Sequence, residues 1–205
     1  MMVETRKRSA QRTRERILQA AMLHFSQRSY EAARLRDIAV TVGVDVALVH
    51  RSFGSKEDLF ASTLEAAFDQ RFEERIAAPD MAESLSAGFF ETRLDPQLGI
   101  VDPFDIIIRS LGSEQASPFL RDFVRRRYSQ PLVERLGSQR PECAALILGC
   151  LGGLIIFYDI LAVGTLSDAS KKNMQRLLKQ VIRQCAEDGS GKVAMATAGN
   201  NCDDL

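Results

Sequence analysis

The stretch RLRDIAVTVGVDVALVHRSF, residues 34–53, decides the fold of this chain. Its pattern predicts two short helices, 35–42 and 46–52, separated by a tight turn at Gly43. Glycine suits that turn because it takes positive φ without the strain that a Cβ causes. Asp45 stands just before the second helix, where a carboxylate accepts the first free backbone N–H groups as an N-cap. This spacing is typical of a helix-turn-helix, whose second helix fits the major groove of DNA.

Apolar residues in and before this stretch supply a small core. Ala39 is small enough for the two helices to cross closely. We expect four further side chains to pack against a preceding helix: Ile38, Val44, Val49 and Phe53. That helix is predicted over 11–27, where Ile17, Leu18, Ala21, Met22 and Phe25 recur at helical spacing. His24 lies near this apolar stripe, and we interpret it as a structural residue.

Another helix start follows the stretch directly. Ser55 is the expected N-cap, and Asp58, three residues on, completes a capping box. The helix is predicted to run to about Ala78, because Pro79 follows it. Later helical patterns are clearest over 142–163 and 167–187. Because the sequence shows no sustained period-two alternation, it predicts an all-α protein.

Charge is distributed unevenly along the chain. Lys and Arg balance Asp and Glu at 27 each, but residues 1–56 hold 11 basic against 5 acidic residues. Residues 57–205 hold 16 against 22, so a net charge of +6 at one end is offset by −6 on the rest. A basic end on an acidic body favours contact between that end and a polyanion, the alternative being chance clustering of solvated charges.

Residues 30–60, YEAARLRDIAVTVGVDVALVHRSFGSKEDLF, resemble the DNA-binding domain of TetR-family transcriptional regulators. The residues shared with the family's motif are Tyr30, Arg36, Asp37, Ile38, Ala39, Gly43, Val44, Val49, Phe53, Ser55, Lys56, Glu57 and Leu59. The similarity covers about 12–72. It implies a repressor that binds a double-stranded operator as a homodimer and is released by a small-molecule effector.

The domain organisation follows from the resemblance and from composition. The resemblance implies a helix-turn-helix DNA-binding domain of three helices over 12–56 and a C-terminal helical effector-binding and dimerisation domain over 57–187. The polar, Arg-rich residues 1–11 are expected to form a flexible basic arm. Residues 188–205 are small, polar and rich in Gly and Ala, and are expected to be disordered.

Four residues depart from the family's pattern. Ala33 and Arg34 stand where the family has a Ser or Thr cap, so a cap worth about 1 kcal/mol is expected to be missing. His50 stands where a tyrosine is common, and it can still donate a hydrogen bond to phosphate, more strongly when protonated. Val46 replaces a residue that is often polar, which favours methyl contacts with thymine.

The DNA-binding residues are predicted from their place in the motif. The first residues of the second helix face the groove, and nearby cationic or donor side chains meet phosphates. The expected set is Arg34, Arg36, Asp45, Val46, Ala47, Leu48, His50, Arg51 and Lys56. For Arg51 and Lys56 the alternative is an ordinary solvated charge.

A dimer surface is expected because one helix-turn-helix contacts too few bases to select an operator. The candidate is the run 144–166, which is apolar nearly all round, together with the helix after it. The predicted interface residues are Leu146, Gly149, Gly153, Ile156, Leu177 and Val181. A membrane span is disfavoured, because Asp159 interrupts an uncharged run that is shorter than the roughly 20 residues needed.

The family resemblance also implies an apolar effector cavity between the two ends of the chain. Its candidate lining residues are Phe89, Phe104, Ile108, Leu111, Phe123 and Tyr128. Helical spacing makes ordinary core packing the alternative for each of them. The run 125–127, three arginines, is interpreted as a solvated helix face.

Other classes of function have little support in the sequence. Two histidines and four cysteines without a C-x-x-C pair supply neither a metal site nor a catalytic set, so we expect no enzyme and no cofactor. Residues 189–192, GSGK, lack the first glycine and the Ser or Thr of a phosphate-binding loop. The first residues lack an apolar signal core, which favours the cytoplasm. The remaining alternative is a helical ligand-binding or scaffold dimer without specific DNA recognition.

Overall fold

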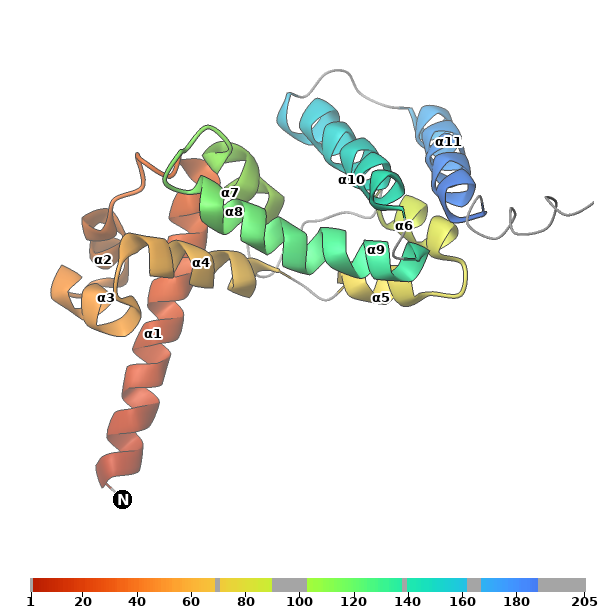
Figure 1. Cartoon of the computed structure of the whole chain (residues 1–205). Helices are drawn as coiled ribbons and strands as arrows, with labels where there is room; N and C mark the ends of the chain where they lie inside the picture. The colour runs from red at the N-terminus through yellow and green to blue at the C-terminus, as the bar shows by residue number, and fades with distance from the viewer. Residues whose placement is uncertain (1, 69–70, 90–102, 138–139, 162–166, 188–205) are drawn as a thin grey trace, which may run out of the picture. The chain divides into compact units, whose positions relative to one another are not determined.

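The computed structural model describes residues 2–68, 71–89, 103–137, 140–161 and 167–187, and all its regular elements within those ranges are helices (Figure 1). The all-α prediction is therefore confirmed. The helices are α1 (Met2–Gln27), α2 (Leu35–Val42), α3 (Val46–Phe53), α4 (Lys56–Ala67), α5 (Arg71–Ala77), α6 (Met81–Phe89), α7 (Pro103–Ser110), α8 (Ser117–Val124), α9 (Gln130–Leu136), α10 (Pro141–Ile155) and α11 (Asp168–Glu187), with π-helical turns η1 (Arg125–Ser129) and η2 (Ile156–Ile160). The chain divides into two compact units, one of residues 1–72 and 92–128 and the other of residues 73–91 and 129–205.

The first unit is built around α1, which packs against α2, α4 and α7, while α4 also packs against α8. An aromatic cluster holds its centre. The rings of Phe25 and Tyr30 each meet the ring of Phe60 edge-to-face with centroids 5.0 Å apart. All three side chains are fully buried, and burying each contributes about 1.5–3 kcal/mol.

α1 begins at Met2, so the flexible arm expected over 1–11 is helical from residue 2 onward. The physical reason lies in the residue types. The segment contains neither Gly nor Pro, and eight of its eleven residues are Met, Arg, Lys, Glu, Ala or Gln, which extend a helix at little cost. The Gln11 side chain adds a hydrogen bond to Glu15 one turn on, at 2.9 Å.

The helix predicted from Lys56 to about Ala78 is two helices, so that prediction is wrong. α4 ends at Ala67, and Phe68 is extended with φ −69° and ψ 127°. The Phe68 ring lies edge-to-face against Phe123 and Tyr128, with centroids 6.0 and 5.5 Å away. Packing against these rings fixes an extended backbone at Phe68 and ends the helix, although the local sequence favours its continuation.

The second unit pairs α11 with α6 and with α10. Ile147 on α10 and Ile182 on α11 are fully buried, so the two helices share an apolar seam. Ion pairs join α11 to the start of α6, Arg183 to Asp80 at 2.8 Å and Lys179 to Glu83. The helix predicted over 142–163 agrees with α10 and η2, and the helix predicted over 167–187 agrees with α11. Residues 162–166 and the expected disordered tail 188–205 lie outside the described residues.

Candidate nucleic-acid interface

The turn between α2 and α3 has the predicted chemistry. Gly43 adopts φ 75° and ψ 38°, the left-handed conformation. The Val44 N–H donates to the Ala39 carbonyl at 3.0 Å, and the Gly43 N–H donates to Val40 at 3.0 Å, which closes the end of α2. A Cβ on Gly43 would meet nothing within 4 Å, so positive φ alone makes glycine necessary here.

The two helix starts in this region are capped differently. The Asp45 carboxylate accepts from the Ala47 N–H at 2.6 Å, as predicted for the N-cap of α3. At α2, Arg34 occupies the N-cap position and makes no side-chain cap, so the expected absence of a cap is confirmed. The first N–H groups of α2 therefore have no side-chain cap, and the Arg34 side chain is exposed.

The core beneath α2 and α3 largely follows the prediction. Ile38, Ala39, Val49 and Phe53 are buried, whereas Val44 is only half-buried because it follows the turn. The Arg14 guanidinium of α1 lies over the Phe53 ring, 4.3 Å from its centroid. This packing fixes α3 against α1 from beneath and leaves the other face of α3 available for a ligand.

The exposed part of α3 carries the predicted groove-facing and phosphate-facing side chains. Asp45, Ala47, His50 and Arg51 are exposed, and Val46 and Leu48 are half-buried. Ala47, His50 and Arg51 are three and four residues apart, so they share one helix face. Arg34 and Arg36, at the start of α2, are also exposed.

His50 is tied to the end of its own helix. Its Nδ1 lies 2.9 Å from the Gly54 carbonyl oxygen, and the Gly54 N–H donates to the His50 carbonyl at 2.8 Å. Gly54 has φ 86°, and a Cβ on it would lie 2.9 Å from the Asp58 carboxylate. His50 was predicted from the sequence as a site residue, but its two hydrogen bonds with Gly54 were not.

The Lys56 side chain is half-buried and contacts the protein itself. Its Nζ lies over the Tyr30 ring, 4.3 Å from the centroid, and partial burial lowers the pKa of the ammonium. The neighbouring capping box is confirmed, since the Asp58 N–H donates to Ser55 Oγ at 3.0 Å and the Ser55 N–H donates back to Asp58 at 3.1 Å. Hydrogen bonds from Ser55 hold the pKa of the Asp58 carboxyl below its usual value.

His24 is the structural residue that the sequence predicts. It is buried, with Nε2 2.8 Å from Thr41 Oγ1 and Nδ1 3.0 Å from the Arg28 guanidinium. Arg28 also pairs with Asp37 at 3.3 Å. Burial, and then the Arg28 charge, lower the pKa of His24, so the fold favours its neutral form. These bonds join α1 to α2.

Aromatic side chains gather in the part of the first unit where the effector cavity is predicted. The ring of Tyr128 contacts four others, Phe68, Phe72, Phe104 and Phe123, with centroid distances of 4.9 to 6.0 Å. Three of the predicted lining residues, Phe104, Phe123 and Tyr128, are thus brought together. Sequence reasoning missed Phe68 and Phe72, because it placed them on a continuous helix.

The structure describes the side chains of two of the other predicted lining residues. Leu111 is 58% exposed just beyond the end of α7, because the helix buries Ile106 and Ile107 instead. Ile108 is half-buried, and the side chain of Phe89 lies outside the described residues.

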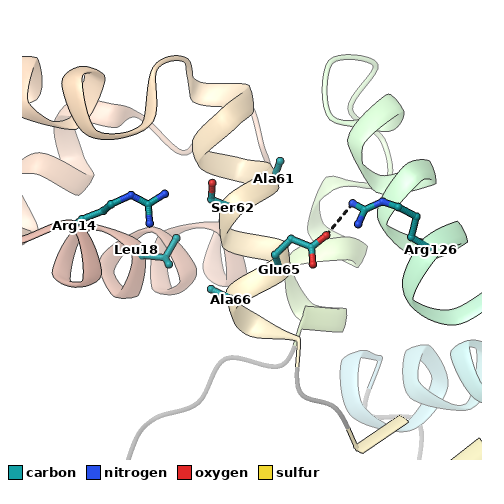
Figure 2. Close-up of a pocket in the computed structure, with 7 residues that line it drawn as sticks. All are labelled: Arg14, Leu18, Ala61, Ser62, Glu65, Ala66 and Arg126. Carbon is teal, nitrogen blue, oxygen red and sulfur yellow. Dashed lines mark hydrogen bonds and ion pairs between the residues drawn. The ribbon is translucent and has the colours of Figure 1, made fainter. Parts of the chain in front are cut away.

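The arginines of 125–127 form a solvated face only in part, because Arg125 and Arg126 are exposed but ion pairs engage all three side chains. Arg126 pairs with Glu65 of α4 at 2.8 Å, and Arg127 pairs with the same carboxylate at 2.6 Å. Arg125 and Arg126 also bond Asp122 one turn earlier. Figure 2 shows the Glu65–Arg126 pair beside an open hollow of about 500 Å³ whose walls come from α1, α4 and η1. Its lining includes none of the predicted effector residues.

The predicted dimer residues are partly or fully exposed in the single chain. Leu146 is 52% and Leu177 49% exposed, Gly149 and Gly153 are exposed, and Ile156 and Val181 are half-buried. The segment Pro141–Tyr158 is also the one described helix long and apolar enough to cross a membrane, a test that apolar core helices of soluble proteins pass too. Among the residues that the structure describes, no group of three His, Cys, Asp or Glu side chains could hold a metal ion.

Comparison with known proteins agrees with this layout. Residues 17–63 match the family model for bacterial regulatory proteins of the tetR family, and residues 80–185 match that for the tetracyclin repressor-like C-terminal domain. The HTH-type transcriptional repressor NicS of Pseudomonas putida is 38% identical over 68 residues, which is 32% of each chain. The match therefore spans about a third of that relative's length.

Solved structures with a similar fold include the multidrug binding protein EbrR. Its imidazole complex superposes with a TM-score of 0.61 at 19% identity, covering 82% of this chain and 89% of that one. Its proflavin complex superposes with a TM-score of 0.54 at 16% identity, covering 83% and 99%. At these identities the similarity concerns the fold.

Proposed function

Because the chain belongs to the TetR family of bacterial transcriptional regulators, we propose that it is a repressor that binds a palindromic operator as a homodimer and is released by a small apolar effector. The observation that carries the proposal is the helix-turn-helix itself. Gly43 closes α2, Asp45 caps α3, and the face of α3 away from the core exposes a cationic and polar set. We propose that this regulator acts in the cytoplasm and has no catalytic role.

In the proposed complex, Val46, Ala47 and Leu48 contact base edges at the start of α3. Arg51 and Arg36 meet phosphates through exposed guanidinium groups. Arg34 adds its charge at the start of α2, where a helix N-terminus favours an anion. His50 and Lys56 complete the set, although both also bond within the protein.

A homodimer is supported by the exposed apolar face of α10 and α11. Leu146 and Leu177, on two helices that pack against each other, are about half exposed, and apolar residues gathered on one surface mark an interaction site. A Cβ on Gly149 or Gly153 would meet nothing within 4 Å, so nothing in the described part of the chain itself requires glycine there. Close approach of a partner helix supplies that requirement. Two half-sites about 34–36 Å apart, or a multiple of that distance, then match the two recognition helices.

Release by an effector follows from linkage. The effector is proposed to bind more tightly to a state in which the two α3 helices no longer fit successive major grooves. Its ratio of affinities for the two states then sets the factor by which it lowers operator affinity. α4 is the natural lever, because Ser55 and Asp58 begin it beside α3 and Phe68, at its end, packs on the aromatic cluster of Tyr128.

The test is selection of genomic DNA fragments by the purified protein at near-physiological salt with competitor DNA. Recovery of one palindromic motif is expected. Recovery of nothing above background by a folded dimer would favour the scaffold or ligand-binding alternative.

A variant pair sharpens the test. Arg51→Ala should weaken binding to all sequences and flatten the slope of log K against log salt by about 0.9 for each phosphate that the protein no longer neutralises. Arg125→Ala removes the same charge from η1, where Arg125 pairs with Asp122, and should leave both quantities unchanged. Equal effects of the two variants would argue against a phosphate contact by Arg51.

A further inference from the structure

The hydrogen bond between His50 and Gly54 fixes which imidazole nitrogen carries the proton. A carbonyl oxygen can only accept, so Nδ1, 2.9 Å from Gly54 O, must be the donor. In the neutral ring the other nitrogen, Nε2, therefore holds a lone pair and no hydrogen. Because the ring is exposed on α3, this Nε2 is the atom that His50 offers to a ligand.

The backbone keeps the ring in this state. The Gly54 N–H also donates a hydrogen bond to the His50 carbonyl at 2.8 Å, so two hydrogen bonds join these residues at the end of α3. A phosphate oxygen, like a carbonyl, only accepts. The neutral ring thus presents a lone pair to an acceptor, which is repulsive, and it cannot present Nδ1–H without giving up the Gly54 bond.

We propose that His50 binds the DNA backbone only as the imidazolium, so that operator binding takes up one proton at each half-site. The proposal rests on the proposed DNA-binding function. The proton adds to Nε2, forms an Nε2–H donor and a positive charge, and leaves the Nδ1–Gly54 bond intact. Imidazole changes charge between pH 5 and 8, so DNA affinity increases as the pH falls through this range.

Charged groups on the elements around α3 set the background for this protonation. Both cationic and anionic groups affect how readily the imidazole takes up a proton, and several of the cationic groups already contact other parts of the protein. Arg14 of α1 stacks on Phe53, Arg16 of α1 donates to Val42 O, and Lys56 of α4 lies over Tyr30. Among the described side chains, the charged groups on α3, its cap and the elements that pack against it are Arg8, Arg12, Arg14, Glu15 and Arg16 of α1, Arg34, Arg36 and Asp37 of α2 and its cap, Asp45 and Arg51 of α3 and its cap, and Lys56, Glu57, Asp58 and Glu65 of α4.

None of the other side chains in this set is a histidine, and the chain has one further histidine, His24. Substitution of His50 or His24 can therefore show which histidine takes up a proton near neutral pH. If the imidazolium contact strengthens binding about tenfold over the neutral ring, the affinity per half-site rises with falling pH by at most about tenfold.

The experiment measures anisotropy of a fluorescein-labelled duplex that contains the fragment recovered by selection, or a duplex of about 30 base pairs and arbitrary sequence if none is recovered. The dissociation constant is determined at three pH values from about 6 to 8 at constant ionic strength, with circular dichroism to verify folding. Three variants are compared with the unsubstituted protein. His50→Asn keeps a donor for Gly54 O but offers the phosphate none, and His50→Gln offers the phosphate an uncharged donor at every pH. His24→Gln is the control.

The expected result is a pH-dependent affinity for the unsubstituted protein and for His24→Gln, and a flat profile for both His50 variants, with Asn the weaker. Binding that is equally tight at all three pH values would overturn the proposal and leave the DNA-binding function standing. A pH dependence that survives in both His50 variants would place the proton elsewhere and overturn it too. Absence of binding to any duplex at any pH would overturn both the proposal and the function.

Discussion

Glu65 is the point at which α4 is held to η1, and Glu65→Gln tests how strongly. Its carboxylate accepts three charge-assisted hydrogen bonds, one from Arg126 at 2.8 Å and two from Arg127 at 2.6 and 2.9 Å. Arg127 also lies over the Phe68 ring, 5.0 Å from its centroid. The substitution keeps the shape and one acceptor oxygen but removes the charge.

The expected cost lies between two limits. Exposed ion pairs contribute about 0.2–1 kcal/mol, and removal of one partner from a fully buried pair costs about 3–5 kcal/mol. Glu65 is 31% exposed and its partners 45% and 35%, so the site is half-buried. We expect Glu65→Gln to lower the free energy of unfolding by about 1–2 kcal/mol, which at this chain length lowers Tm by roughly 3–6 °C.

Asp122→Asn is the matched control, since Asp122 bonds Arg125 at 2.9 Å and Arg126 at 2.8 Å, but within one helical run and at the surface. Such a pair one turn apart is worth about 0.3–0.5 kcal/mol. The assay is urea unfolding followed by far-ultraviolet circular dichroism at fixed protein concentration. If Glu65→Gln costs no more than Asp122→Asn, the carboxylate does not hold α4 to η1 and the reasoning is wrong.

Three further outcomes are expected. Ser55→Ala removes the hydroxyl cap of α4 and should lower the free energy of unfolding by about 1 kcal/mol in thermal melts. Leu146→Glu should convert the proposed dimer to a monomer in light scattering, whereas Leu23→Glu, which alters an exposed leucine of α1, should leave the mass unchanged. His24 has a lowered pKa in the fold, so its stabilising contribution is present above about pH 6.5, the unfolded value, and is lost as the pH falls through the lower folded pKa. The native protein should therefore lose more stability than His24→Gln between about pH 7 and pH 5 in pH-dependent urea melts; equal losses would contradict this.

The parts of the fold that the sequence predicts well are those determined by neighbours along the chain. The bounds of α2, the cap at Asp45 and the capping box at Ser55 all depend on groups close to one another in the sequence. The Gly43 turn belongs to the same class, because its φ is a property of one residue. Local chemistry is visible in the sequence, and so the local geometry of the helix-turn-helix could be predicted almost residue by residue.

Apart from the arm over residues 2–11, which is helical for local reasons, the errors occur where distant segments meet. The break after Ala67 depends on Phe123 and Tyr128, which lie far along the chain from it. The pairing of Arg126 and Arg127 with Glu65 is equally remote in sequence. A run of arginines taken alone is indistinguishable from a solvated face, and a helical pattern taken alone has no reason to stop at Phe68.

In the proposed release by an effector, α4 is the suitable lever because its two ends are fixed in different ways. Its start is fixed locally by Ser55 and Asp58, beside α3, and its end is fixed by contacts of Glu65 and Phe68 with η1 and α8. A ligand that separates the aromatic rings changes the second set of contacts without touching the first. Substitutions at the two ends should therefore be separable: Ser55→Ala alters DNA affinity without effector, whereas Glu65→Gln alters the factor by which effector changes that affinity. If both variants changed the same quantity, α4 would move as part of one rigid head, and the coupling would have to reach α3 through α1 and α7 instead.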